Sequence, residues 1–330
     1  MSAAPPDRGP ADPGPTRPDQ RGPAQPDRGP ADPGPTRPDQ RGTARIIDGR
    51  AIAAHISERA AESAAALRER GVTPVLAVVV PNDDPGAAWY VRSLQRLAVR
   101  VGVECQLHQL PGRATAADVL AKLTDLSADR GVHGVICQAP LPDGLAPAAA
   151  GARIAVAKDV DGANPASLGG LAAGVPGVFA PATAAAVMEI LAAEHVDLVG
   201  RPAVVVGRST VVGKPAALLL LAASATVTVC HSRTRNLAEV CRTAEILVVA
   251  AGRPHLVGAA HVAPGAVVID VGTNPADGGG MVGDVDTVAV EAVAAAVTPV
   301  PGGVGPVTTA QLMRQTVRAA LDATVGADAG

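Results

Sequence analysis

After the first 45 residues, apolar and polar residues alternate in blocks that predict helices and strands in turn. Apolar residues recur at helical spacing within residues 50–70, namely at Ile52, Ile56, Ala60 and Leu67. The unbroken apolar run Val75–Val80 is typical of a strand that is buried on both faces of a parallel sheet. The same patterns predict helices at 86–101 and 115–129, and strands at 103–109 and Val132–Cys137. This βαβαβ series implies an open parallel sheet with helices on both faces.

A second α/β series follows a segment at 139–176 that is rich in proline and glycine. After a helix at about 183–194, the pattern predicts further strands and helices at Ala203–Val206, Lys214–Ala223, Thr226–Cys230, Ile246–Ala250 and Val267–Val271. A last helix at about 307–324 is expected to pack back on the first domain. We therefore predict an α/β fold of two lobes with parallel sheets, an N-terminal αβα lobe at 46–181 and a Rossmann-type lobe at 182–306.

The first 45 residues differ in composition from the rest of the chain. They contain 12 of the 30 prolines, and the 17-residue block at 6–22 recurs unchanged at 26–42. The block contains no valine, isoleucine, leucine or aromatic residue, so it cannot bury enough apolar surface to offset the entropy lost on ordering. We predict a disordered, partly polyproline-II tail at 1–45. A binding tail and a neutral duplicated extension are both compatible with it, and the mixture of Asp and Arg favours the second.

Composition narrows the classes of function. Aromatic residues make up 1% of the chain, which leaves no stacking platform for single-stranded nucleic acid. The net charge of −3 provides no basic surface for nucleic acid or anionic membranes. Neither a transmembrane helix nor a secretory signal is expected, because no apolar run of about 18 residues occurs and the N-terminus lacks an apolar segment.

The four cysteines are scattered along the chain at Cys105, Cys137, Cys230 and Cys241. None belongs to a Cys-x-x-Cys pair or to a Cys/His spacing that holds a metal, so no metal site is expected. Free thiols of this kind indicate the reducing cytoplasm.

One turn in the second series has the features of a phosphate-binding loop. The strand Ala203–Val206 runs into the glycine-bounded turn Gly207–Gly213, which opens a helix whose backbone N–H groups can hold phosphate oxygens. Its Gly-x-Ser-x-x-x-Gly spacing differs from the usual Gly-x-Gly-x-x-Gly. A tight turn with Pro215 at the start of the helix explains both glycines equally well. Two further glycine-rich loops, at 251–254 and 271–274, each follow a predicted strand. Ligands of open α/β sheets bind at loops in this position, beyond the carboxyl ends of the strands.

The end of the next strand favours NADP over NAD. NAD sites place an acidic residue there to bind the ribose 2′-hydroxyl, whereas this strand ends in Cys230, His231, Ser232 and Arg233. Together with Arg208 in the preceding turn, these cations and hydroxyls suit a 2′-phosphate. The alternative is a solvated turn in a chain that is rich in arginine.

Several motifs, in this order along the chain, resemble those of one enzyme family. They are Ile46–Gly49, Tyr90-Val91, Gly134–Gln138 with Pro140–Pro142, Lys158–Gly162, Gly207–Pro215, Ile269–Gly272, Gly283–Val285 and Thr298–Pro306. From Ile46 to about Leu321, the chain resembles the bifunctional methylenetetrahydrofolate dehydrogenase/methenyltetrahydrofolate cyclohydrolase (FolD) family. The tail has no counterpart in this resemblance.

The resemblance implies a homodimer of two-lobed chains, with a folate-binding catalytic domain at 46–181 and an NADP-binding domain at 182–306. It implies oxidation of 5,10-methylenetetrahydrofolate with NADP to the methenyl form, followed by hydrolysis to 10-formyltetrahydrofolate. The residues that it implies are Tyr90, Gln138 and Asp161 for catalysis, and Gly207, Arg208, Ser209, Ser232 and Thr273 for NADP. Without the resemblance, Asp161 is explained as a turn cap before glycine, and Gln138 as a hydrogen-bonding residue at the end of a strand.

One position departs from the motif of the family, which is Tyr-x-x-x-Lys on one helix. Tyr90 is followed four residues later by Leu94, and the three lysines of the chain are Lys122, Lys158 and Lys214. Residues four apart share a helix face, and a lysine there would serve proton transfer, which typically contributes ~10²–10⁴-fold. We expect hydrolysis to be severely weakened while dehydrogenation persists. Two alternatives stay open: a catalytically silent relative that binds NADP, and a dehydrogenase of another small substrate.

Overall fold

The computed structural model describes residue 1 and residues 43–328, apart from residues 83, 84, 113 and 277. Residues 2–42, which make up nearly all of the predicted tail at 1–45, lie outside the described residues. Within the described part of the chain, no helix is both long and apolar enough to cross a membrane.

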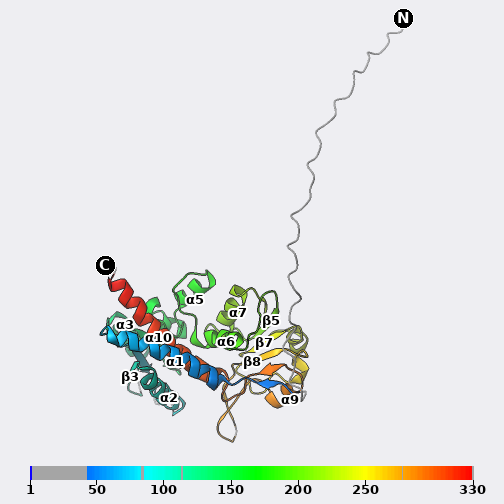
Figure 1. Cartoon of the computed structure of the whole chain (residues 1–330), viewed down its shortest axis with the longest axis horizontal. Coiled ribbons are helices and arrows are strands. Elements are labelled where there is room, and N and C mark those ends of the chain that lie inside the picture. The colour runs from blue at the N-terminus through cyan, green and yellow to red at the C-terminus, as the bar shows by residue number, and fades with distance from the viewer. Residues whose placement is uncertain (2–42, 83–84, 113, 277, 329–330) are drawn as a thin grey trace. The chain divides into compact units, whose positions relative to one another are not determined.

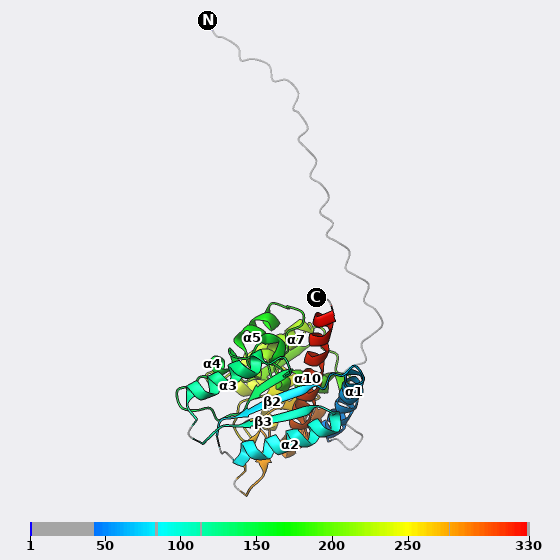
Figure 2. The ribbon, with the colours of Figure 1, turned by 90° about the vertical axis from the view of Figure 1, so that its left-hand side faces the viewer.

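The first sheet consists of three parallel strands in the order β3-β2-β4 (Figure 2). Its strands and crossover helices are β2 (Val75–Val80), α2 (Pro85–Val101), β3 (Glu104–Gln109), α3 (Ala116–Ala128) and β4 (Gly134–Cys137). All six residues of β2 are buried, because a central parallel strand has strands on both edges and other elements on both faces. These elements form the βαβαβ series that the hydrophobic pattern predicts.

The second sheet consists of six parallel strands in the order β1-β11-β8-β7-β5-β6. The strands are β1 (Arg45–Ile46), β5 (Pro202–Val206), β6 (Thr226–Cys230), β7 (Ile246–Val249), β8 (Val267–Asp270) and β11 (Ala296–Val297). Strand β5 pairs with β6 on one edge and with β7 on the other, so the strand order reverses beside β5. Ligands of open α/β sheets bind outside the carboxyl ends of the strands at such a reversal.

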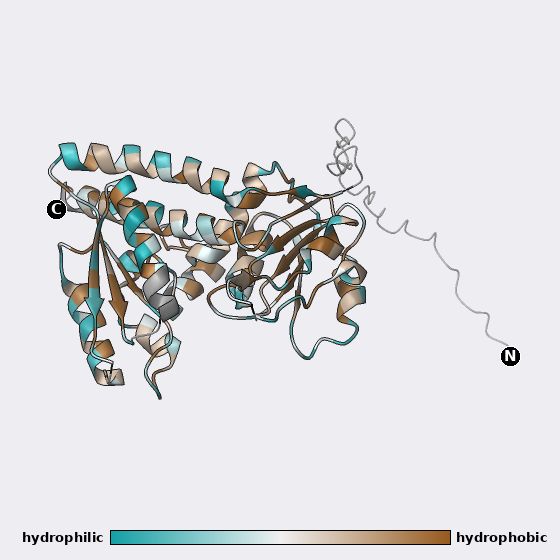
Figure 3. Ribbon diagram, turned by 90° about the horizontal axis from the view of Figure 1, so that it is seen from below, coloured by the Kyte–Doolittle hydropathy of each residue, from teal (hydrophilic) through white to brown (hydrophobic). Residues whose placement is uncertain are grey.

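Shorter elements complete this second lobe. They are α6 (Ala182–Ala193), α7 (Gly213–Ala222), α8 (Leu237–Cys241), η2 (Ala259–His261), the antiparallel pair β9 (Asn274–Pro275) and β10 (Met281–Val282), and α9 (Thr287–Glu291). Figure 3 shows that the strands of both sheets are predominantly hydrophobic, whereas many of the helices also carry hydrophilic residues. This difference is expected when a sheet is buried between layers of helices.

Two long helices, α1 (Gly49–Glu69) and α10 (Val304–Asp328), lie side by side (Figure 1). The backbone comes very close to itself where the two helices begin. A Cβ atom on Gly49, the first residue of α1, would lie 1.9 Å from the carbonyl oxygen of Gly303, which directly precedes α10. Helix α10 also packs on α2 and α6. Its Met313 belongs to the core around the first sheet and its Val307 to the core around the second. The helix expected at 307–324 thus begins at Val304 and contacts elements of both lobes.

The segment between the two sheets contains short helices that the hydrophobic pattern does not reveal. They are α4 (Pro147–Gly151), the 3₁₀ helix η1 (Val156–Lys158) and α5 (Pro165–Ala172). Helix α5 starts at a capping residue, Asn164, whose Oδ1 accepts a hydrogen bond of 2.8 Å from the N–H group of Ala166. The first strand, β1, pairs with β11 in the second sheet, before the chain crosses to the first sheet. The domain limits at 46–181 and 182–306 therefore stay a prediction.

Candidate active site

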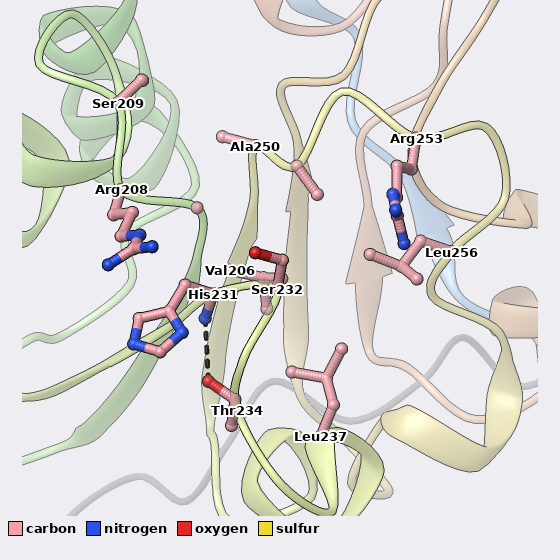
Figure 4. A pocket seen from close by; sticks show the side chains of 12 residues that line it. Val206, Arg208, Ser209, His231, Ser232, Thr234, Leu237, Ala250, Arg253 and Leu256 are labelled. Atoms are coloured by element: carbon pink, nitrogen blue, oxygen red, sulfur yellow. Dashed lines mark hydrogen bonds between the residues drawn. The ribbon is translucent and has the colours of Figure 1, made fainter.

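A pocket of about 340 Å³ lies at the carboxyl ends of β5, β6 and β7 (Figure 4). The turns that follow these three strands line it, and its polar side chains are Arg208, Ser209, His231, Ser232, Thr234 and Arg253. This is the place where the strand order reverses, and its volume is typical of sites for small molecules.

Two positions that bound the turn after β5 accept only glycine. Gly207 has a φ of +138°, and a Cβ atom there would lie 2.1 Å from the carbonyl oxygen of Ala250. A Cβ atom on Gly213, the first residue of α7, would lie 2.3 Å from the carbonyl oxygen of Gly207. The two glycines therefore bring the turn against β7 and against the start of α7, as a dinucleotide-binding turn requires.

Hydroxyl groups order the pocket turns. Ser209 Oγ accepts hydrogen bonds from the N–H groups of Val212 (3.1 Å) and Gly213 (3.3 Å). Since both bonds use the oxygen as acceptor, the hydroxyl proton of Ser209 can be donated to a ligand. In the turn after β6, Thr234 Oγ1 accepts a hydrogen bond of 2.9 Å from the N–H group of His231 (Figure 4).

The charges of the pocket suit a phosphorylated dinucleotide. Arg208 and His231 lie on one side and Arg253 on the opposite side (Figure 4). Among the described lining residues, none carries a carboxylate that would repel a phosphate or mark an NAD-type ribose site. The donor set of guanidinium and hydroxyl groups therefore fits NADP, with Arg208 or Arg253 available to a 2′-phosphate.

The structure brings together four of the five residues predicted to contact NADP. Gly207, Arg208, Ser209 and Ser232 all line the pocket. Thr273 is exposed in the loop after β8 and is not among the described lining residues. Arg253 also lines the pocket, although the sequence pattern indicates only a glycine-rich loop at the crevice for residues 251–254. Only the position of this loop after a strand could have signalled Arg253.

A second cluster of polar groups lies where α2 and α10 approach the turn after η1. Tyr90 of α2 lies beside Thr309 of α10, whose hydroxyl donates a hydrogen bond of 3.2 Å to the carbonyl oxygen of Gly305. Burial raises the pKa of Tyr90 well above its ordinary value, and the negative charge of Asp161 raises it further. Tyr90 therefore stays a neutral hydroxyl that can donate a hydrogen bond. Asp161 lies close enough to Tyr90 for its negative charge to raise the pKa of the tyrosine.

Burial raises the pKa of Asp161 to about 7, and the neighbouring Asp159 adds to the rise. Asp159 is itself completely buried, and it orders the turn through hydrogen bonds with the N–H groups of Ala163 (2.8 Å) and Asn164 (2.9 Å). Its carboxylate is thus occupied by the turn. A carboxyl group that changes charge near neutral pH is typical of a functional site.

Gln138 follows β4 at the carboxyl end of the first sheet, and its N–H group donates a 2.8 Å hydrogen bond to the carbonyl oxygen of Val79. In the part of the chain that the structure describes, no hydrogen bond joins its side chain to Tyr90 or Asp161. Tyr90 and Asp161 lie close together, and Gln138 stands at the end of β4.

Leu94, at the position of the motif lysine, is completely buried in the core of the first lobe. None of the three lysines lies on α2: Lys122 is on α3, Lys158 is in η1 and bonds the carbonyl oxygen of Asp129, and Lys214 is on α7. One turn after Tyr90, helix α2 therefore carries a buried leucine and no amine.

The chain combines two α/β lobes. One has a parallel sheet with a glycine-dependent turn and a cationic pocket, and the other brings the half-buried Tyr90 and Asp161 close together. These features are typical of two-lobed enzymes that bind a dinucleotide. Two family models match the chain. The tetrahydrofolate dehydrogenase/cyclohydrolase catalytic domain matches residues 47–161, and the NAD(P)-binding domain of the same family matches residues 181–324. The chain therefore belongs to the tetrahydrofolate dehydrogenase/cyclohydrolase family.

Relatives and solved structures agree with this assignment. The bifunctional protein FolD of Parafrankia sp. (strain EAN1pec) is 60% identical over 276 residues, which cover 84% of this chain and 99% of the relative. The bifunctional FolD structure from Campylobacter jejuni is 38% identical, with a TM-score of 0.82 over 84% of this chain and 99% of that chain. The FolD structure from Trypanosoma brucei, complexed with NADP cofactor and inhibitor, is 35% identical, with a TM-score of 0.81 over 86% and 99%.

These matches confirm the predicted family, the two-lobed α/β fold, the assignment as a methylenetetrahydrofolate dehydrogenase and the choice of NADP as cofactor. The roles of the site residues, the domain limits and the weakened hydrolysis stay predictions.

Proposed function

We propose that this chain oxidises 5,10-methylenetetrahydrofolate to 5,10-methenyltetrahydrofolate with NADP, and that hydrolysis of the product is much slower than in relatives with the motif lysine. Bound NADP supplies the nicotinamide carbon that accepts the hydride. The observation that carries the proposal is the cationic pocket beside Gly207 in a chain that both domain models of this family match.

In the nucleotide pocket, the Gly207 turn and Ser209 would hold phosphate oxygens at the start of α7. Arg208 and Ser232 would bind the phosphate on the ribose, and Thr273 would contact the cofactor from the loop after β8. Because a hydride acceptor must be positioned more than activated, these residues would act by orientation and by excluding water.

In the first lobe, ionised Asp161 would accept hydrogen bonds from the N–H groups of the pterin. Tyr90 would donate its neutral hydroxyl to a polar atom of the folate, and Gln138 would orient the neighbouring groups. These roles would place the one-carbon bridge over the nicotinamide.

The proposed weakness in hydrolysis rests on Leu94. Hydrolysis of the methenyl bridge requires a water molecule to lose a proton, and a positioned base would accept it. Leu94 has no exchangeable proton, and its burial excludes water from that position. Arg92 and Arg96 cannot replace a lysine, because both are exposed and a guanidinium does not lose its proton.

We also propose that the chain is a homodimer that pairs through the edge of the second sheet. Strand β6 is an edge strand with exposed Val229, and it borders an apolar groove of about 380 Å³ that includes exposed Leu221 of α7. An exposed apolar edge strand is a liability unless another chain covers it. Analytical ultracentrifugation of the full chain tests this proposal, and a monomer at micromolar concentration would contradict it.

We place the protein in the cytoplasm, with the four free cysteines as support.

The reaction is tested with purified full chain, methylenetetrahydrofolate and either NADP or NAD, followed by the absorbance of the reduced cofactor. We expect reduction with a clear preference for NADP. NADP binding without reduction would indicate a catalytically silent relative, and reduction only with other substrates would indicate a different dehydrogenase.

A further inference from the structure

Two buried carboxylates of the second lobe have no part in the reaction proposed above. Asp270 is the last residue of β8, and Asp284 follows β10. Both side chains are completely buried, and neither forms a salt bridge with any residue that the structure describes. Since an uncompensated buried charge is costly, each carboxylate must be held by hydrogen-bond donors.

Asp284 is held by a turn of the nucleotide pocket. Its Oδ2 accepts hydrogen bonds from the N–H groups of Ala251 (2.6 Å) and Gly252 (2.8 Å), and its Oδ1 accepts one from Arg253 (2.8 Å). The side-chain amide of Asn274 donates a fourth bond of 2.9 Å to Oδ1. Three consecutive N–H groups therefore point at one carboxylate, and the turn that supplies them also lines the pocket with Ala251 and Arg253.

Consecutive N–H groups that converge in this way form a binding site for an anion. In this turn the protein's own carboxylate occupies that site, so the three N–H groups are not available to a phosphate of the cofactor. The turn after β7 therefore offers a phosphate its Arg253 side chain rather than its backbone N–H groups, and the Gly207 turn lies on the opposite side of the pocket (Figure 4).

Asp270 holds the segment that carries Asp284. Its Oδ1 accepts hydrogen bonds from the N–H groups of Gly272 (2.9 Å) and Asp284 (3.1 Å), and its Oδ2 accepts one from Val285 (3.0 Å). A Cβ atom on Gly283 would lie 1.8 Å from Asp270 Oδ2, so only glycine fits there. The two carboxylates thus link β8 to the 251–253 turn in a continuous series of hydrogen bonds.

We propose that Asp284 is a positioning residue for the dinucleotide. By gathering the N–H groups of the 251–253 turn, it fixes the wall of the pocket and the point from which Arg253 enters it, opposite Arg208 (Figure 4). Asp270 supports this role by fixing the backbone of Asp284. The proposal rests on the NADP site described above.

The test compares Asp284→Asn with Asp286→Asn in the full chain. Asparagine at 284 presents an N–H group to N–H donors, so the turn must move. Asp286 is a matched control, because it lies two residues away and only caps α9, through a 3.2 Å bond from the N–H group of Ala289. By calorimetric titration, we expect Asp284→Asn to weaken NADP binding by about tenfold or more, as loss of charge-assisted hydrogen bonds predicts. The control should bind as the wild type does.

A role through the turn has a further signature in coupling. If Asp284 acts by placing Arg253, the effects of Asp284→Asn and Arg253→Ala on NADP affinity are not additive in a double-mutant cycle. The KM for NADP should rise in Asp284→Asn, while kcat at saturating NADP and the KM for the folate stay within a factor of about three. Should Asp284→Asn fail to fold, Asn274→Ala removes a single donor and should weaken NADP binding by a smaller factor.

Unchanged NADP affinity in folded Asp284→Asn, equal losses in both aspartate variants or additive effects in the cycle would overturn the proposal. A wild-type chain that binds no NADP would instead overturn the proposed function, so the two failures can be told apart.

Discussion

Replacing Leu94 with lysine restores the motif amine at the position where the chain lacks it. Leu94 is completely buried, so the change forfeits about 1.5–3 kcal/mol of apolar burial. Burial also disfavours a charged amine and lowers its pKa toward neutrality, which yields a base that can accept a proton from water. We expect a total loss of about 3–5 kcal/mol in the free energy of unfolding, which a domain stable by about 5–15 kcal/mol can tolerate.

The gain is measured as hydrolysis of methenyltetrahydrofolate, followed by its absorbance and corrected for the reaction without enzyme. Leu94→Lys should accelerate hydrolysis by ~10²–10⁴-fold over the wild type, with hydride transfer changed much less. Leu97→Lys is the matched control, because Leu97 is another buried leucine of α2, and this variant should share the destabilisation without the gain. Leu94→Met should change neither activity.

Two outcomes would refute this reasoning. One is wild-type hydrolysis as fast as NADP reduction, which would mean that another group supplies the proton transfer. The other is a folded Leu94→Lys variant, shown by circular dichroism, that hydrolyses no faster than Leu97→Lys.

Two further predictions concern Asp161 and Gln311. Burial raises the pKa of Asp161 from its ordinary value of 3.8 to about 7, so its carboxyl group binds a proton more tightly in the folded state. Its contribution to stability is therefore present at low pH and lost as pH rises through about 7. Over the same range the fraction of ionised Asp161, the form that accepts hydrogen bonds from pterin N–H groups, increases. The KM for the folate should therefore fall between about pH 6 and 8. Asp161→Asn should abolish that trend in KM, and an unchanged trend would contradict the role. Gln311 is completely buried, and its amide nitrogen and oxygen have no partner among the described residues; Gln311→Met should raise the free energy of unfolding in urea by about 1–3 kcal/mol, and a decrease would show that the amide is needed.

The sequence predicts those parts of the fold that rest on continuous hydrophobic patterns. Strand β2 is an apolar run of six residues, and it is buried throughout as expected. Helix α10 begins at Val304, three residues before the predicted start. The predicted start is late because Gly305 and Pro306 are residue types that are typical of loops. The first four N–H groups of a helix need no intrahelical partner, so Pro306 is acceptable in the first turn. Strand β1 has two residues, too few for a periodic pattern, and depends on its partner β11.

The candidate site was predictable where a local motif carries it. The Gly207 turn follows from two glycines between a strand and a helix, and the structure shows the close approaches that require them. The roles of Arg253 and Asp284 depend on hydrogen bonds between segments about 30 residues apart, which no local pattern encodes. Burial of Leu94 likewise becomes visible only once α2 packs on the first sheet.

The most direct test of the account follows both products of a single reaction of the full chain with methylenetetrahydrofolate and NADP. We predict that methenyltetrahydrofolate accumulates in step with reduced NADP, and that 10-formyltetrahydrofolate appears much more slowly than reduced NADP. If 10-formyltetrahydrofolate forms as fast as NADP is reduced, or if NADP is not reduced at all, the account is contradicted.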